Sequence, residues 1–204
     1  HYSGQSQLSY LSQMTVIVGL QYLSPLMGLA LLVAMLRALF LQSAQQQDLE
    51  QNKWNRINLG NYWMDIIRPL FRFFIPLGFV FSLLLTFQGV PATLSAGSTA
   101  QVLEQSTEVK TQHIPLGPVA PMVAIKQLGS NGGGWYGPNS SVPLENPTPL
   151  SNFLEMLAIL LIPVSVIFML GFFTKRAKFA GLVFASMLLM SIISATSAIW
   201  SASL

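Results

Sequence analysis

Hydrophobic residues in this chain form long uninterrupted runs that polar stretches separate. Four runs are long enough to cross a hydrocarbon core of about 30 Å, which takes about 20 helical residues. We predict membrane-spanning helices over Met14–Leu41, about Ile66–Gly89, Phe153–Phe173 and about Phe179–Trp200. Pro25 predicts a kink in the first helix. Arg68 and Arg72 lie in the opening turns of the second helix, from which their side chains can reach the interface. The pattern predicts an all-α integral membrane protein.

Composition supports this class. Of the 204 residues, 52% are hydrophobic and 8% are charged, whereas soluble domains carry roughly 25% charged residues. The absence of cysteine excludes disulfides and thiolate metal sites. Ten Lys and Arg residues outnumber seven Asp and Glu residues, but they sit in small groups between apolar runs, so we expect no nucleic-acid partner. The chain begins with His rather than Met, and we expect it to be a fragment of a longer protein.

The distribution of Lys and Arg predicts the orientation, because cytoplasmic connections carry an excess of these residues. Basic residues cluster around the connection 42–65 and make up most of the connection 174–178. The connection 90–152 has only Lys110 and Lys126, opposed by three glutamates, Glu104, Glu108 and Glu145. We therefore expect 42–65 and 174–178 to be cytoplasmic and 90–152 to be external.

The external connection contains a short apolar segment, Pro118–Leu128. Pro118 suits the first helical position, and Gly129 is a natural residue just past a helix end. A helix of this length spans about 16 Å, roughly half a bilayer. A half-length helix followed by a glycine run and a return to the surface predicts a re-entrant loop, and irregular backbone survives at that depth only where protein or water surrounds it.

The glycine run reads GSNGGGWYGPNSS, and we call its residues 129–134 the glycine loop. Ser130, Asn131, Gly132, Gly133 and Gly134 offer successive backbone carbonyls, and rings of carbonyls can replace the hydration shell of K+. Glycine accepts the φ values that turn carbonyls to one side, and the carbonyl end of the short helix favours a cation there. A flexible external linker remains the alternative. A phosphate loop is excluded because no GxxxxGK[ST] string occurs.

An internal repeat is suggested where the first and third predicted spans begin. LSYLSQM at 8–14 aligns with LSNFLEM at 150–156. The repeating unit would be span, short helix, glycine loop and span. Residues 66–173 would then hold a complete unit, 1–41 the end of a preceding unit and 174–204 the start of a following one. Since one loop supplies only part of a coordinating ring, several units must combine.

The string IPLGPVAPMVAIKQLGSNGGGWYGPNSSVPLENPTPLSNFLEMLAI at 114–159 closely resembles the potassium-channel-like subunit (KdpA) of the Kdp potassium-importing P-type ATPase. The stretches 2–14 and 87–91 also resemble this family. The resemblance implies a pseudo-fourfold channel of four such units in one chain, with a filter strand over residues 130–134. It singles out Gly132, where a side chain would intrude on the ion path. Ser130 stands where the family commonly has Thr, and Trp135-Tyr136 where it usually has two Phe.

The resemblance also implies function and partners. The chain would bind and translocate K+ as a non-hydrolytic subunit of an ATP-driven import complex, because no aspartate-phosphorylation motif or nucleotide site occurs in it. K+ would be the transported ion, with no organic cofactor. Partners would be a P-type ATPase catalytic subunit, small accessory membrane subunits and membrane lipid, in a bacterial-type inner (plasma) membrane.

Two alternatives remain open. One is a gradient-driven potassium channel or symporter of the same superfamily, and the other is a membrane scaffold without transport activity. Among the remaining polar residues, we expect Lys126 to be solvated or bonded to carbonyls. We expect Glu155 to be placed by the dipole at the start of a span, and His113 to have no chemical role.

Overall fold

The computed structural model describes residues 8–41, 59–102 and 110–203. Most of the expected cytoplasmic connection 42–65 lies outside the described residues. So do residues 2–7 of the stretch that resembles KdpA, and Glu104 and Glu108 of the connection 90–152.

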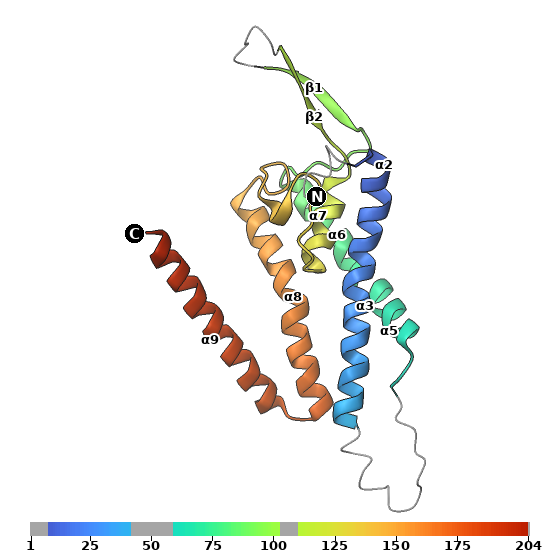
Figure 1. Ribbon diagram of the computed structural model, residues 1–204, viewed down its shortest axis with the longest axis vertical. Coiled ribbons are helices and arrows are strands. Elements are labelled where there is room, and N and C mark those ends of the chain that lie inside the picture. Colours follow the sequence, from blue (N-terminus) through green and yellow to red (C-terminus); the bar gives the residue numbers. More distant parts are fainter. Residues whose placement is uncertain (1–7, 42–58, 103–109, 204) are drawn as a thin grey trace, which may run out of the picture. The chain divides into compact units, whose positions relative to one another are not determined.

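Four helical segments in the described part of the chain are long and apolar enough to cross a membrane (Figure 1). They are Tyr10–Phe40, Tyr62–Phe87, Pro149–Thr174 and Ala177–Ala202. The first consists of α2 (Tyr10–Ser12), a π-helical turn (Gln13–Ile17), α3 (Val18–Leu36) and a second π-helical turn (Arg37–Leu41). The second consists of α5 (Tyr62–Pro69), a π-helical turn (Leu70–Phe74) and α6 (Ile75–Phe87); the third is α8 (Pro149–Thr174) and the fourth α9 (Ala177–Ala202). The four predicted spans are confirmed as apolar helices.

The helices begin a few residues before the predicted apolar runs, and polar side chains cap the first turns of α2 and α8. Ser9 has an extended backbone, and its Oγ accepts a hydrogen bond of 3.2 Å from the Ser12 N–H. At the start of α8, Thr148 Oγ1 accepts from the Ser151 N–H and Ser151 Oγ accepts from the Thr148 N–H, each at 3.0 Å. Such reciprocal bonds satisfy N–H groups that a helix leaves unpaired at its start. Helix α3 continues through Pro25, and the kink predicted there stays a prediction.

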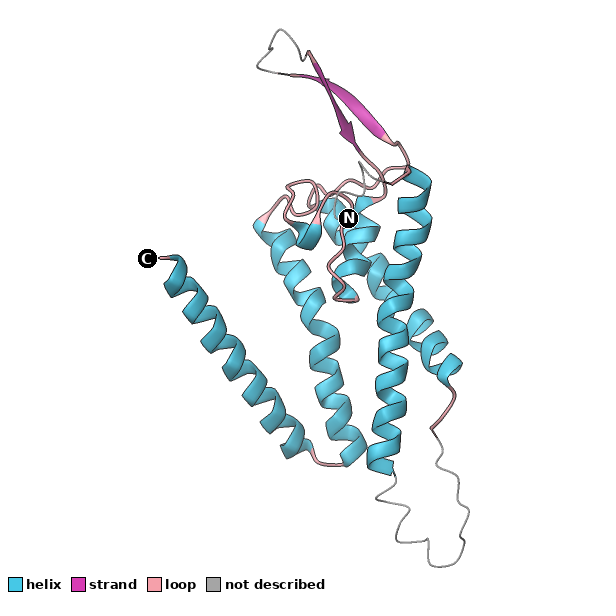
Figure 2. Ribbon diagram, viewed as in Figure 1, coloured by secondary structure: helices cyan, strands magenta, loops and turns pink. Residues whose placement is uncertain are grey.

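The segment 90–152 also contains a β-hairpin, which the sequence pattern did not predict (Figure 2). Strands β1 (Gly97–Gln101) and β2 (Thr111–Pro115) are antiparallel, in a register that runs from Gly97 opposite Pro115 to Gln101 opposite Thr111. The strand GSTAQ has almost no apolar residues, so it lacks the alternating pattern on which a strand prediction rests. His113 lies in β2, and its ring occupies the space that a side chain at Gly97 would fill.

The chain forms two compact units: residues 1–30 with 62–160, and residues 31–61 with 161–204. In the second unit, the end of α8 packs closely on the start of α9, and a Cβ added at Gly171 would lie 2.6 Å from that of Ala180. The turn between them contains Lys175 in a left-handed conformation, with φ 53°. The Phe168 and Phe184 rings stack obliquely, with centroids 5.9 Å apart.

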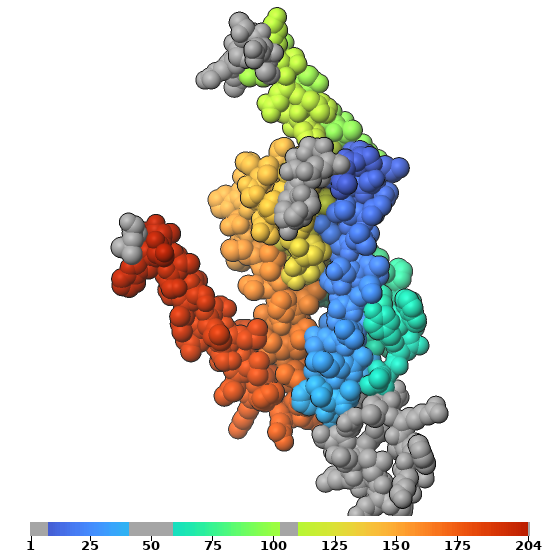
Figure 3. All heavy atoms as spheres, in the orientation of Figure 1, coloured from blue at the N-terminus to red at the C-terminus, as the bar shows by residue number. Residues whose placement is uncertain are grey.

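The first unit is built around the short helix α7 (Val119–Leu128), which packs against α6. Every α7 residue except Pro121 is buried, including the polar Lys126 and Gln127. The predicted half-length helix is thus present, although Pro118 is its N-cap rather than its first residue. In Figure 3 the atoms of the glycine run, drawn in yellow, lie directly beside the blue atoms of the first helix.

Candidate functional site

The glycine loop begins where α7 ends, in a hydrogen-bonded turn. The Ser130 N–H donates to the Gln127 carbonyl at 3.0 Å, and the Asn131 N–H donates to the Lys126 carbonyl at 3.2 Å. This pair of bonds is the Schellman arrangement, which requires a left-handed residue just beyond the helix cap. Gly129 is the cap, as predicted, but Ser130 is the left-handed residue, with φ 50°. Gly129 is needed for space instead, because a Cβ there would lie 2.8 Å from Pro25 Cγ.

Within the loop, left-handed and other conformations alternate. Ser130 and Gly132 have φ values of 50° and 75°, and Asn131 between them is not left-handed. In such alternation the N–H groups of successive residues turn to one side, so their carbonyls turn to the other. Gly134 has a different reason to be glycine: a Cβ would collide with the Gly137 carbonyl and lie 2.6 Å from both Glu145 carboxylate oxygens. Gly133 has room for a methyl group, since its nearest neighbour would be Gln21 Nε2 at 3.5 Å.

Two of the loop carbonyls are held by named partners. The Gly132 carbonyl accepts from the Asn139 N–H at 2.9 Å, and the Gly133 carbonyl accepts from Gln21 Nε2 of α3 at 2.7 Å. No hydrogen bond within the described residues reaches the carbonyls of Ser130, Asn131 or Gly134. Since each carbonyl oxygen has two lone pairs, all five retain the capacity to accept another partner.

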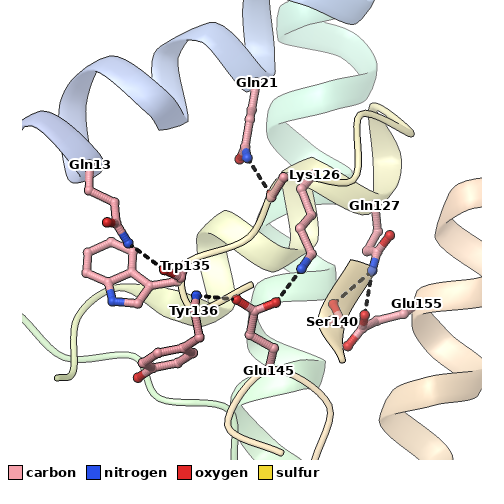
Figure 4. A network of polar contacts seen from close by, with 10 residues as sticks. Gln13, Gln21, Lys126, Gln127, Trp135, Tyr136, Ser140, Glu145 and Glu155 are labelled. Atoms are coloured by element: carbon pink, nitrogen blue, oxygen red, sulfur yellow. Dashed lines mark hydrogen bonds and ion pairs between the residues drawn. The ribbon is translucent and has the colours of Figure 1, made fainter. Parts of the chain in front are cut away.

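Behind the loop lies a buried ion pair that corrects our expectation for Lys126. The Lys126 side chain is fully buried and its Nζ is paired with Glu145 Oε2, and the Glu145 side chain is also fully buried (Figure 4). The other oxygen, Glu145 Oε1, accepts a 2.8 Å hydrogen bond from the Tyr136 N–H. Lys126 is therefore neither solvated nor a carbonyl-bonding lysine. The sequence interpretation missed this because Glu145 follows Lys126 by 19 residues and only the folded loop brings them together.

A second buried contact joins α7 to α8. Gln127 Nε2 donates to Glu155 Oε2 at 2.5 Å and to Ser140 Oγ at 3.0 Å (Figure 4). Glu155 lies in the second turn of α8, whose first turn contains no acidic residue. Because the helix dipole acts mainly on the first turn, the dipole does not account for Glu155; its side chain is 3% exposed and accepts the hydrogen bond from Gln127. Asn139 and Ser140 both have left-handed backbones, with φ 56° and 54°, which returns the chain toward Gly132.

The residues after the loop, Trp135 and Tyr136, are buried and anchor it from the other side. The Trp135 carbonyl accepts from Gln13 Nε2 at 3.0 Å, and the Trp135 ring meets Tyr10 edge-on, with centroids 5.7 Å apart. Tyr136 donates its hydroxyl to the Pro115 carbonyl at 2.7 Å. Burial, with a smaller contribution from the nearby Glu145 carboxylate, raises the pKa of Tyr136 to about 12.

The structure assigns to Gln13, Gln21, Asn139 and Glu145 contacts with the glycine loop and with the two residues after it, which the sequence did not indicate. Gln13 and Gln21 could have been noticed in the sequence, because they are polar residues in an otherwise apolar helix. They lie eight residues apart, on the buried side of that helix. Asn139 and Glu145 carry no such signal in a polar loop. In the part of the chain that the structure describes, no group of three or more His, Asp or Glu residues is placed to hold a metal ion. The polar atoms available at the loop itself are those of its backbone and of the Ser130 and Asn131 side chains.

Comparison with known proteins agrees with the resemblance noted in the sequence. Residues 1–204 match the family KdpA, described as potassium-transporting ATPase A subunit. Among curated relatives, proteins named potassium-transporting ATPase potassium-binding subunit are similar to this chain. The one from Pseudomonas putida is 40% identical over 98% of this chain and 33% of its own length. Those from Leptospira interrogans and Clostridium perfringens are 42% and 40% identical, over 91% and 94% of this chain and 31% and 32% of their own lengths.

The chain thus spans about a third of the length of the curated relatives it matches. The family match covers the glycine loop together with all the residues that hold it. The chain belongs to the KdpA family, the potassium-transporting ATPase A subunits.

Proposed function

We propose that this chain is part of a potassium-binding and potassium-translocating subunit of an ATP-driven import complex, and that Ser130–Gly134 line its ion path. The relatives' name, potassium-binding subunit of a potassium-transporting ATPase, supports the ion and the energy source. It favours this proposal over a gradient-driven channel or symporter and over a scaffold without transport activity.

The observation that carries the site assignment is the conformation of the glycine loop. Its backbone alternates between left-handed and other conformations at Ser130 and Gly132, immediately beyond the carbonyl end of the buried helix α7. Such alternation favours carbonyl oxygens on one side of the chain, and carbonyl oxygens are the ligands that potassium filters use in place of water. The loop is also tied to α3, α7 and the residues that follow it. A flexible linker has no need of such ties.

One loop covers one side of an ion path, so the proposal includes further pore units outside this chain. Residues 66–173 form one complete unit, 1–41 the end of another and 174–204 the start of a third, in a pseudo-fourfold channel. The connections 42–65 and 174–178 face the cytoplasm and 90–152 faces outward, across a bacterial-type inner membrane.

This chain supplies the ion path rather than ATP hydrolysis. Its partners are a P-type ATPase catalytic subunit, small accessory membrane subunits and membrane lipid. K+ is the transported substrate, and no organic cofactor enters the proposal.

Gly132 is the position that tests the site. Its φ of 75° disfavours any L-residue, and a Cβ would lie 2.7 Å from Asn139 Oδ1. We expect Gly132→Asp, in the full-length protein within its complex, to raise the KM for K+ and to reduce discrimination between K+ and Rb+ in transport-coupled ATP hydrolysis.

Gly137→Ala is the matched control. Gly137 belongs to the same run but has an extended backbone, and a Cβ there would meet its nearest neighbours at 3.6 Å. We expect it to leave both quantities unchanged. Wild-type K+ affinity and K+/Rb+ discrimination in an assembled Gly132→Asp complex would remove the glycine loop from the ion path.

A further inference from the structure

Burying the Lys126–Glu145 ion pair carries a desolvation free energy, so a contribution to folding stability alone does not explain why the pair is present. Both side chains are fully buried, and taking two charges out of water costs several kcal/mol per ion before they attract each other. A pair of apolar residues of similar size is often as stable or more stable in such a place. The contacts of the two residues indicate what the charges do.

Glu145 holds the far end of the glycine loop. Its Oε1 accepts the Tyr136 N–H at 2.8 Å, and both its oxygens lie 2.6 Å from the position that a Cβ at Gly134 would occupy. The carboxylate therefore rests against the bare Cα of the last loop residue. Gly134 must lack a side chain for this contact to exist.

Lys126 holds the near end of the same loop. It lies in the last turn of α7, and its backbone carbonyl accepts the Asn131 N–H at 3.2 Å. Its side chain reaches across to Glu145 Oε2. One residue thus contacts the start of the loop through its backbone and the end of the loop through the carboxylate that it pairs with.

We propose that the Lys126–Glu145 pair is a positioning clamp that fixes the distance between the two ends of the glycine loop and thereby sets discrimination between K+ and Rb+. The inference rests on the proposed function, because it requires the loop to line the ion path. Neither side chain touches the ion. They act through Asn131, Gly134 and Tyr136.

The reason for a charged clamp is stiffness. K+ and Rb+ carry the same charge and differ in radius, so a site that separates them by geometry has to hold its oxygen atoms at a set spacing. A hydrogen bond to a charged group is stronger and shorter than a neutral one, and a buried charge cannot leave its partner without a large penalty. Apolar packing would fill the same volume but leave the loop freer to adjust.

The test uses the full-length protein in its complex, with the KM for K+ and the K+/Rb+ ratio of KM values as readouts. Glu145→Asp keeps both charges but withdraws the carboxylate by one methylene from Gly134 and Tyr136. We expect the KM for K+ to rise about tenfold, the factor that corresponds to weakening one hydrogen bond to a charged group. We expect the K+/Rb+ discrimination to fall, with the maximal rate at saturating K+ little changed.

The double variant Lys126→Met with Glu145→Gln covers the case in which Glu145→Asp fails to assemble. It removes both charges at nearly constant volume, and the glutamine oxygen can still accept the Tyr136 N–H. We expect it to assemble and to discriminate less well between K+ and Rb+. Lys110→Met, at an exposed external position, is the control for loss of a lysine and should leave both readouts unchanged.

Assembled variants with the wild-type KM and K+/Rb+ ratio would overturn the clamp. Loss of assembly in both the Glu145→Asp and the double variant would also overturn it, in favour of a role in folding alone. The Gly132→Asp variant separates the two proposals. If Gly132→Asp changes ion selection and the clamp variants do not, only the clamp fails; if Gly132→Asp changes nothing, the filter assignment fails first.

Discussion

Two adjacent glycines of the loop, Gly133 and Gly134, should respond in opposite ways to the same substitution. Neither has a left-handed backbone, so a methyl group meets no conformational penalty at either. A Cβ at Gly133 would lie 3.5 Å from Gln21 Nε2, an ordinary contact with the end of a flexible side chain. A Cβ at Gly134 would overlap the Gly137 backbone carbonyl and press on the Glu145 carboxylate at 2.6 Å.

The magnitudes follow from these neighbours. At Gly134, overpacking costs about 1–3 kcal/mol, and displacing Glu145 from the Tyr136 N–H costs about 1.5–3 kcal/mol more, the worth of a hydrogen bond to a charged group. We therefore expect Gly134→Ala to destabilise the protein by roughly 2.5–6 kcal/mol. Gly133→Ala reduces the freedom of the unfolded chain without native strain, and we expect a change between zero and about 1 kcal/mol of stabilisation.

The assay compares the two variants and the wild type as full-length protein in the detergent-purified complex. The midpoint of thermal inactivation reports stability, and the amount of assembled complex per membrane reports folding. Gly134→Ala should lower both clearly, while Gly133→Ala should match the wild type. Equal losses in the two variants, or a larger loss in Gly133→Ala, would refute the steric account of the loop.

Two further predictions concern the partners of the loop. Gln21→Leu removes the donor to the Gly133 carbonyl at nearly constant volume. Loss of one net hydrogen bond, about 1 kcal/mol, should raise the KM for K+ roughly fivefold. An unchanged KM would show that this carbonyl needs no support from α3. Tyr136, whose pKa is raised from 10.0 to about 12, should make stability depend on alkaline pH. In the unfolded chain this phenol ionises near pH 10 and in the folded protein near pH 12, so its contribution is complete below pH 10 and is lost as the pH rises toward 12. Thermal midpoints from pH 9 to 12 should therefore fall less steeply in Tyr136→Phe than in the wild type, and parallel curves would contradict this.

Much of the architecture could be predicted from the sequence because membrane spans are local features. A run of about 20 apolar residues has few alternatives to a helix across the hydrocarbon core, and the four predicted runs correspond to the four long apolar helices. The short helix ending at Leu128 was also predictable, because proline and glycine bracket it. The hairpin of β1 and β2 was not, because its strands lack an apolar pattern and are held by backbone pairing.

For the candidate site too, the sequence indicated where the loop lies but not what each of its residues does. The glycine loop could be located from the sequence, because several glycines in a short run indicate a backbone conformation that other residues disfavour. The individual roles of its residues could not be predicted: Ser130 rather than Gly129 is left-handed, and Gly134 is glycine because a carboxylate lies against it.

The sequence by itself determined the four long apolar helices found in the described part of the chain, the short helix between the second and third, and the glycine loop after it. The length of an apolar run and the density of glycines depend only on residues that are neighbours in the sequence, so both can be recognised without the fold. Only the tertiary structure decided that Lys126 is buried against Glu145 and that Gln13 and Gln21 hold the loop from the first helix. These contacts join residues between 19 and 122 positions apart, and a charge or an amide in the sequence does not say which distant partner will satisfy it once water is excluded.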